Sequence, residues 1–236
     1  NVLGAEANDE MMEISQRVSP KLSQTSNNIF LNEKLLARVK SIYDKKEQLN
    51  LSTEDAKLLE DLYESFKANG ATLNKDDKEK YRKLSMDLSM LTLQFDQNAL
   101  KDKNRLELLI TDENELSGLP ESARDAAAML AKSKDKNGWL FNLSAPSYIP
   151  FMRYSDKRDL REKMYREYMS VGNKGDEFDN KDIIKKIVNI RLEIAQLMGF
   201  KNYAEYALEH TMAKNSANVY KLLNQLLEAY KPIAIN

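Results

Sequence analysis

The chain has no cysteine among its 236 residues and only one histidine. The absence of cysteine excludes a disulfide framework, a thiol nucleophile and a thiolate metal site. It leaves the cellular compartment open, because proteins without cysteine occur in oxidising and in reducing compartments. We expect a cytoplasmic protein, with the periplasm as the alternative.

No charge of one sign dominates the chain, since 36 basic residues balance 37 acidic ones. This balance argues against a basic nucleic-acid surface, and a hydrophobic content of 42% argues against general disorder. Long hydrophobic runs are also missing, and none approaches the roughly 18 residues that cross a membrane. We therefore expect neither a nucleic-acid partner nor a membrane partner.

Glycine and proline are scarce, with seven and five residues, and nearly all of them fall where a helix should begin or end. The scarcity predicts a mostly α-helical, elongated fold. A chain of this length could bury about 70% of the surface that it exposes when unfolded. No fixed internal period indicates a solenoid. We expect a helical part at residues 1–104, a small α+β element at 105–145 and a second helical part at 146–236.

Residues 179–213 carry the clearest helical pattern. Asp179 or Asn180 can cap a first helix, and Gly199 stands where a helix end favours a left-handed residue. Asn202 can cap a second helix, with Glu205 completing a capping box. The first helix should bury the apolar residues that recur every three or four positions: Ile183, Ile187, Ile190, Ile194 and Leu197.

Polar caps predict three helices nearer the start of the chain, after Asn32, Ser52 and Asn74. The helix after Asn74 should reach about Leu100 and present a seam to a neighbouring helix. The helix that ends near Phe66 is the expected partner. The seam consists of Tyr81, Leu84, Leu88, Leu91 and Phe95.

The ends of the remaining helices are predicted from proline and serine. A short helix around residues 11–18 should stop at Pro20, and a last helix capped by Ser216 should stop at Pro232. Ser155 or Asp156 should begin another helix.

Two short strands are predicted where the hydrophobic period becomes two, at residues 106–110 and 139–143. An alanine-rich helix with Pro120 in its first turn should separate them. Ser147 should begin a short helix after the second strand. Two strands alone are marginal, so we expect helices to cover them.

Several short segments, in matching order, resemble a known family. Residues 191–213 read RLEIAQLMGFKNYAEYALEHTMA. This text is similar to RxExAxLxGFxxYAE…MA of the thimet-oligopeptidase family of zinc peptidases, in its peptidyl-dipeptidase and oligopeptidase A branch. Further segments resemble the family's FxxxGAxL corner, LsxLxxxFxxN helix, GLP turn and RxxRExxY helix: residues 66–73, 84–98, 118–120 and 158–165.

The resemblance implies a largely helical clamshell of two lobes around a channel for short peptides, with zinc on an HExxH helix and a further Glu. His210 is the only histidine, whereas such a site needs two, four residues apart. No catalytic, cofactor-binding or metal residue can therefore be assigned to this chain. We expect the upstream, non-catalytic helical portion of a zinc peptidase, inactive by itself. The parent would release C-terminal dipeptides or cut internally, and its catalytic lobe would be the partner.

His210 is the first candidate site residue, with Glu205 and Glu209 nearby in sequence. One imidazole and two carboxylates are too few for a zinc site of this kind, so a surface or boundary histidine is favoured over a metal ligand. The mixed charges of residues 132–136 indicate a solvated loop rather than a nucleic-acid site, because no aromatic platform accompanies them.

Arg153, Arg158 and Arg161 could hold the C-terminal carboxylate of a peptide through bidentate hydrogen bonds. The favoured alternative is ion pairing of Arg158 and Arg161 on a solvated helix face. Its acidic partners would be Asp156, Asp159 and Glu162. Most tyrosines are expected at core edges, and some at a cleft: Tyr148, Tyr154, Tyr165, Tyr168, Tyr203 and Tyr206.

A second hypothesis is a free-standing helical interaction or scaffold module without catalytic activity. A third is a scaffold lobe that dimerises through exposed apolar faces. The missing initiating Met and the apolar stretch at residues 232–235 favour a piece of a longer protein over both alternatives.

Overall fold

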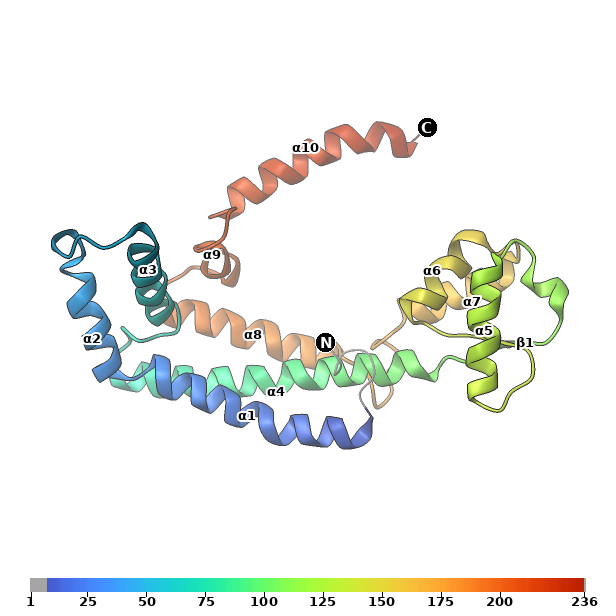
Figure 1. Ribbon diagram of the computed structural model, residues 1–236, viewed down its shortest axis with the longest axis horizontal. Coiled ribbons are helices and arrows are strands. Elements are labelled where there is room, and N and C mark those ends of the chain that lie inside the picture. Colours follow the sequence, from blue (N-terminus) through green and yellow to red (C-terminus); the bar gives the residue numbers. More distant parts are fainter. Residues whose placement is uncertain (1–7, 236) are drawn as a thin grey trace. The chain divides into compact units, whose positions relative to one another are not determined.

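A computed structural model describes residues 8–235, which form ten α-helices and one two-stranded sheet (Figure 1). This confirms the predicted mostly α class with its small β element. The described residues divide into two compact units. Unit 1 comprises residues 8–13 and 93–185, and unit 2 comprises residues 14–92 and 186–235. Within the described range, no helix combines the length and the apolar character that a membrane span requires.

Unit 1 contains the sheet. Strand β1 (Leu108–Ile110) runs antiparallel to β2 (Trp139–Phe141), with Leu108 opposite Phe141 and Ile110 opposite Trp139. Both predicted strands are confirmed. The unit also contains the short 3₁₀ helix η3 (Glu113–Leu116) and the helices α5 (Glu121–Ser133), α6 (Ala145–Tyr154) and α7 (Arg158–Met169).

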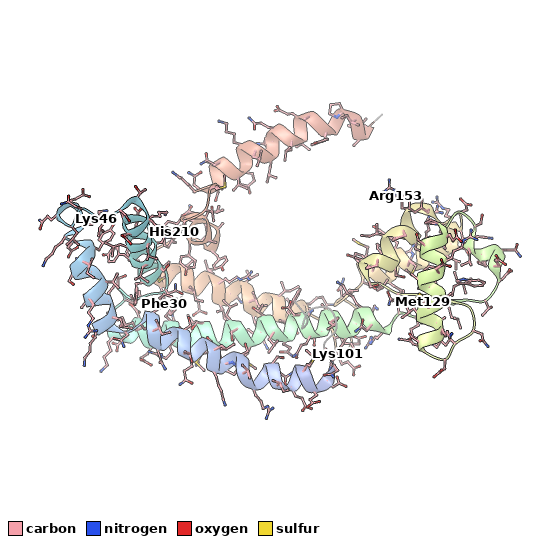
Figure 2. The ribbon with its side chains drawn as sticks, viewed as in Figure 1. Phe30, Lys46, Lys101, Met129, Arg153 and His210 are labelled. Atoms are coloured by element: carbon pink, nitrogen blue, oxygen red, sulfur yellow. The ribbon has the colours of Figure 1, made fainter. Side chains whose placement is uncertain are left out.

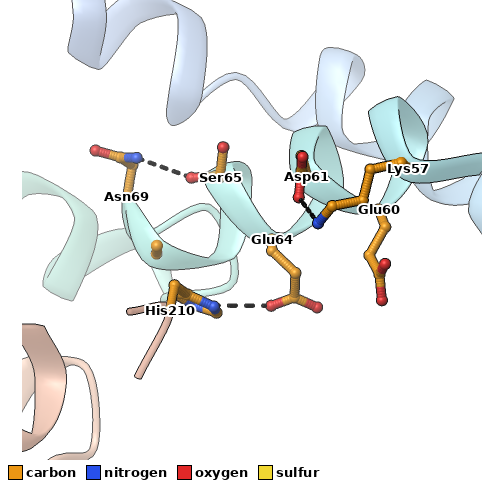
Figure 3. Close-up of a pocket in the computed structure, with 8 residues that line it drawn as sticks. Lys57, Glu60, Asp61, Glu64, Ser65, Asn69 and His210 are labelled. Atoms are coloured by element: carbon orange, nitrogen blue, oxygen red, sulfur yellow. Dashed lines mark hydrogen bonds and ion pairs between the residues drawn. The ribbon is translucent and has the colours of Figure 1, made fainter. Parts of the chain in front are cut away.

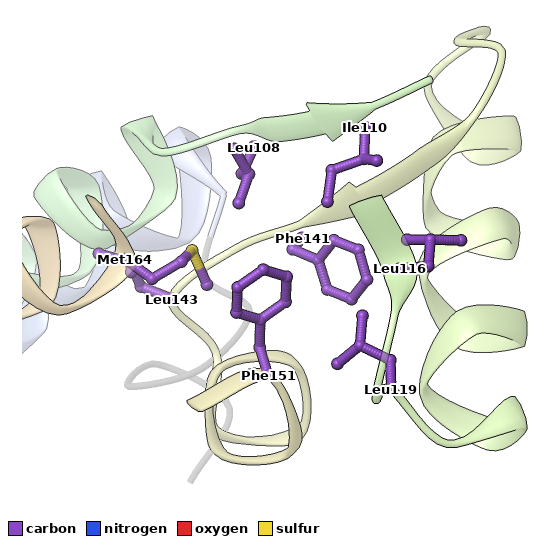
Figure 4. Close-up of a cluster of buried hydrophobic side chains, with 9 residues drawn as sticks. Leu108, Ile110, Leu116, Leu119, Phe141, Leu143, Phe151 and Met164 are labelled. Atoms are coloured by element: carbon purple, nitrogen blue, oxygen red, sulfur yellow. The ribbon is translucent and has the colours of Figure 1, made fainter. Parts of the chain in front are cut away.

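The core of unit 1 lies between the sheet and its helices (Figure 4). The rings of Phe141 and Phe151 meet edge to face with centroids 4.8 Å apart. Trp139 packs against this core from β2. The fully enclosed members of the cluster come from η3, β2, α6, α7 and the segment after β2, which is why the two short strands are stable here: Leu116, Phe141, Leu143, Phe151 and Met164.

A buried carboxylate joins the last part of α4 (Lys75–Arg105) to the turn after α7. Asp102 accepts hydrogen bonds from the Gly172 amide at 2.8 Å and from Lys174 Nζ at 3.0 Å. Gly172 has a φ of +69°, which favours glycine. Asn180 is also buried, and its amide group bonds to the Phe95 carbonyl at 3.1 Å.

Unit 2 has a helical core in which the first part of α4 packs against α8 (Lys181–Leu197). The seam residues Tyr81 and Leu84 contact Ile194 there. The prediction that α3 (Thr53–Ala68) would be the partner is wrong. Phe66 of α3 instead meets Phe30 at 5.4 Å, because the apolar stripe of α8 is longer and covers the seam.

The predicted caps of unit 2 are largely confirmed. Asn32 accepts amide hydrogen bonds at the start of α2 (Glu33–Tyr43), Ser52 accepts from Asp55 before α3, and Asn74 accepts from Asp77 before α4. These bonds satisfy first-turn amides.

Side chains and a glycine also cap the helices of residues 179–213, largely as predicted. Asp179, not Asn180, provides the side-chain acceptor for the Lys181 amide. Gly199 ends α8 with a φ of +84°, and Asn202 caps α9 (Tyr203–Leu208) through the Glu205 amide.

Both predicted proline stops are wrong. Helix α1 (Asp9–Phe30) continues through Pro20, and α10 (Ser216–Ile235) continues through Pro232. Around Pro20, α1 is held to α4 by bonds from Ser19 and Asn27 to serines of α4, and this packing compensates for the lost backbone bond. Only three described residues follow Pro232, so few backbone bonds depend on it.

Three predicted helix starts also shift. Asn215 rather than Ser216 accepts the capping bond of α10, from the Asn218 amide. Helix α6 begins before Ser147, whose hydroxyl accepts from the Asn142 amide instead. Helix α7 follows Lys157, and no side chain caps it.

Candidate functional site

A depression of about 400 Å³ lies on unit 1 between α6 and α7. Leu160 and Met164 of α7 face the core, so a neighbouring stripe of the helix is left at the surface. That flank, together with one residue of α6, lines the depression: Met152, Arg158, Arg161, Glu162, Tyr165 and Arg166.

The charges in the depression are not those that the sequence predicted. Glu162 pairs with Arg166 at 2.7 Å, and Arg161 donates to the Ser155 carbonyl. Within residues 8–235, Arg158 has no ion pair. The predicted pairing of Arg158 and Arg161 with nearby acids is therefore wrong. A Glu that precedes its basic partner by four residues pairs better than one that follows it, so Glu162 selects Arg166.

The other residues named in that prediction have different partners. Asp156 accepts from the Ser117 hydroxyl at 2.7 Å. The Arg153 guanidinium lies 5.2 Å from the centroid of the Tyr154 ring, and Figure 2 shows Arg153 at the surface of unit 1. Neither residue lines the depression.

The candidate tyrosines fall into two groups. Tyr148 and Tyr168 stack with centroids 4.2 Å apart on α6 and α7, and half of the Tyr165 surface is exposed. In unit 2, Tyr206 donates to the Ala68 carbonyl at 2.7 Å beside Tyr203. Burial raises the pKa of Tyr206 above its ordinary value.

His210 lies in unit 2, in a groove of about 490 Å³ beside α3 (Figure 3). Its Nε2 is 3.4 Å from a Glu209 oxygen and 4.0 Å from a Glu64 oxygen, and 46% of its side chain is exposed. Glu64 lies too far away in sequence for any local motif to predict its proximity. The Oε2 atom of Glu64 also forms a salt bridge with Lys67.

Zinc does not fit the side chains around His210. A zinc site of the HExxH kind needs two histidines, and only one is present here. Of the two carboxylates near His210, that of Glu64 is already paired with Lys67 at 2.9 Å. Nowhere in residues 8–235 do three or more histidine, aspartate or glutamate side chains form a group able to hold a metal ion.

Residues 132–136 run from the last turn of α5 into the turn before β2, and two of their three lysines bind one acid. Lys134 and Lys136 both donate to Glu107, which precedes β1. These hydrogen bonds lower the pKa of Glu107 from 4.5 to about 2. The lysines thus link the segment before β2 to the segment before β1, a pairing between distant segments that the local charge pattern could not indicate.

Known proteins resemble the chain along most of its length. Peptidase family M3 matches residues 151–236. Oligopeptidase A of Salmonella typhimurium is 34% identical over 227 residues, which are 94% of this chain and 33% of that protein. Dipeptidyl carboxypeptidase of Escherichia coli is 31% identical over 226 residues, with 95% and 33% covered.

A plant relative, probable cytosolic oligopeptidase A of Arabidopsis thaliana, is 38% identical over 181 residues, which are 74% of this chain and 26% of that protein. The chain spans about a third of the length of the first two relatives. Together with the helical fold and the family match that includes α7, these similarities show that the chain belongs to peptidase family M3, the thimet-oligopeptidase family.

Proposed function

We propose that the chain is the non-catalytic helical portion of a zinc metallopeptidase that hydrolyses short peptides. One observation carries the proposal: 94% of the chain aligns with oligopeptidase A but accounts for only 33% of it. The single histidine supports the proposal, because an HExxH helix needs two. Release of C-terminal dipeptides is the expected cleavage, and internal cleavage is the alternative.

In this proposal the zinc and the catalytic side chains belong to the other two-thirds of the protein. The chain contributes helical support and part of the peptide-binding surface. A cytoplasmic location is proposed, in keeping with the name of the plant relative, and the periplasm is the alternative.

Two measurements test the proposal. The purified chain should not hydrolyse short peptides, and cleavage that a metal chelator abolishes would contradict its non-catalytic role. The reading frame beyond the codon for Asn236 should encode an HExxH helix followed by a further glutamate. A stop codon within a few residues would instead leave a helical binding module.

A free-standing interaction or scaffold module is the second candidate, because α10 exposes an apolar face. None of its described residues is buried. The exposed side chains include Leu222, Leu223, Leu226, Leu227 and Tyr230. Exposed apolar surface of this kind favours association. Sedimentation at increasing protein concentration tests this candidate, and a monomer throughout would contradict it.

A further inference from the structure

We propose that the depression between α6 and α7 binds a peptide carboxylate, with Arg158 and Arg161 as the cationic groups and Tyr165 as an adjoining aromatic surface. The inference rests on the proposed function, since peptide substrates supply the carboxylate. It assigns a binding subsite to residues of this chain.

The balance of charge in the depression supports an anionic ligand. Three of its lining residues are arginines and only one is an acid. The acid, Glu162, already pairs with Arg166 at 2.7 Å. Arg161 donates only to a neutral carbonyl, and Arg158 has no ion pair within residues 8–235. Two guanidinium groups therefore lie in one depression without a carboxylate partner.

The positions of these groups suit a carboxylate in particular. Arg158 and Arg161 are three residues apart on α7, so their side chains emerge from neighbouring positions on one helix flank. A guanidinium offers parallel N–H donors that match the two oxygens of a carboxylate. Both side chains line the same depression and can approach one anion.

The surroundings of the arginines suit a peptide rather than a bare ion. Tyr165 lies four residues beyond Arg161 with half of its surface exposed, and Met152 of α6 lines the same depression. Tyrosine, methionine and arginine are the residue types enriched where proteins bind other chains. A volume of about 400 Å³ is in the range of small-ligand pockets and suits one or two residues.

Glu162 allows a further test of the proposal, because its carboxylate, if it were not paired with Arg166, would compete with the ligand for Arg158 and Arg161. Arg166 holds Glu162 at two nitrogen atoms, at 2.7 and 2.8 Å. Replacing Arg166 should release Glu162 toward Arg158 and Arg161. R166Q should therefore weaken carboxylate binding even though Arg158 and Arg161 remain.

The carboxylate could come from the C-terminus of a peptide or from an acidic side chain, and three probes distinguish these sources. They are N-acetyl-pentaalanine with a free C-terminus, the same peptide as its C-terminal amide, and the amide with a central Glu. Binding to the ¹⁵N-labelled chain is followed by NMR at the arginine Nε–H signals. The Arg158 signal is assigned by its loss in R158Q.

We expect the free-terminus peptide to shift the Arg158 and Arg161 signals and the amide to leave them in place. Binding of the Glu-containing amide alone would keep the carboxylate site and assign it to acidic side chains. Equal shifts with the free peptide and the plain amide, or no shift with any probe, would overturn the proposal.

Variants supply the matched comparison. R158Q should weaken binding of the free-terminus peptide about 10- to 100-fold, the usual effect of losing a hydrogen bond to a charged group. R158K keeps the positive charge but lacks the paired N–H donors of a guanidinium. Its affinity for the free-terminus peptide should lie between that of R158Q and that of the unmodified chain. K163Q removes one charge from the same helix outside the depression and should leave binding unchanged.

Equal weakening by R158Q and K163Q would show a general charge effect and overturn the proposal. These measurements need no zinc and no hydrolysis. Selective carboxylate binding by a protein whose reading frame lacks HExxH would contradict the proposed function and leave the subsite standing. A reading frame that encodes HExxH, combined with no preference of the chain for carboxylates, would support the proposed function and overturn the subsite.

Discussion

The two units bury their apolar side chains to different depths. The buried residues of the unit 1 core cluster keep 0–5% of their surface exposed, whereas those of the unit 2 core cluster keep 5–9%. Unit 1 encloses its core with short helices and two strands that meet from several directions. Unit 2 packs long helices side by side, and its helices α2, α9 and α10 bury no described residue. An enclosed core depends on crossing elements more than on the number of apolar residues.

The largest expected effect tests the enclosed core of unit 1. Phe151→Ala should destabilise the unit by about 3–5 kcal/mol, because it leaves a cavity beside the Phe141 ring. Hydrogen exchange read by mass spectrometry should accelerate in residues 106–170. Leu223→Ala on exposed α10 is the control and should change stability by less than about 0.5 kcal/mol. Equal effects of the two substitutions would remove the contrast between the units.

The next effect concerns the buried carboxylate of unit 1, which has no counterpart in the unit 2 cluster. Asp102→Asn weakens its bonds from the Gly172 amide and the Lys174 ammonium. The expected cost is about 2 kcal/mol in urea unfolding, because both bonds are charge-assisted. The Gly172 amide should also exchange faster. Asp182→Asn, at an exposed ion pair with Lys185, is the control, and a cost as large there would contradict the role of burial.

Alkaline pH should weaken unit 2 through its buried tyrosines. Burial raises the pKa of Tyr81 and of Tyr206 above the ordinary value of 10.0. A raised tyrosine pKa keeps the folded state protonated, so its contribution to stability is full below about pH 10 and declines above it. Tyr81→Phe should cost about 1 kcal/mol near pH 7 and reduce this decline.

Unfolding midpoints measured between pH 8 and 11 check the prediction for Tyr81. Tyr220→Phe controls for the loss of a hydroxyl on exposed α10. An unchanged alkaline decline in the Tyr81→Phe variant would show that the decline comes from other groups.

The smallest effect lies at the acid end and in unit 1. Since Lys134 and Lys136 lower the pKa of Glu107 from 4.5 to about 2, its stabilisation is present above pH 4.5 and is lost as the pH falls toward 2. The three side chains keep 29–45% of their surfaces exposed, so solvent limits the effect to about 0.5 kcal/mol.

Thermal unfolding of the Glu107→Gln variant between pH 5 and 2 measures this contribution. The variant should lose less stability than the unmodified chain over that interval. Parallel pH profiles would show that the two lysines do not stabilise unit 1 through Glu107.

Local features of the fold could be predicted because the chemistry that fixes them is local. Asn32 and Ser52 cap the helices that directly follow them, and the strand at residues 139–141 follows from its alternating pattern. Pairings between distant segments could not be predicted in this way. The stripe that includes Tyr81 shows that α4 needs a neighbour, but it does not identify that neighbour as α8. Continuation of α1 through Pro20 likewise depends on contacts with α4.

The candidate site shows the same division. The sequence places Arg158, Arg161 and Tyr165 on one helix flank, but it offers Glu162 two basic partners at equal spacing. The order of the residues along the helix favours Arg166, a local signal that the predicted pairing overlooked. In the structure Arg166 takes that acid, and Arg158 has no ion pair within residues 8–235. The approach of Glu64 to His210 had no local signal at all.

The place of Trp139 has a spectroscopic consequence. It is the only tryptophan in the chain, and it lies in β2 against the core of unit 1. Emission excited at wavelengths selective for indole therefore reports on unit 1 alone, whereas far-ultraviolet ellipticity averages over the helices of both units. Transitions that coincide in the two signals would indicate one cooperative molecule. Emission that changes after most of the ellipticity is lost would show that unit 1 persists once unit 2 has unfolded.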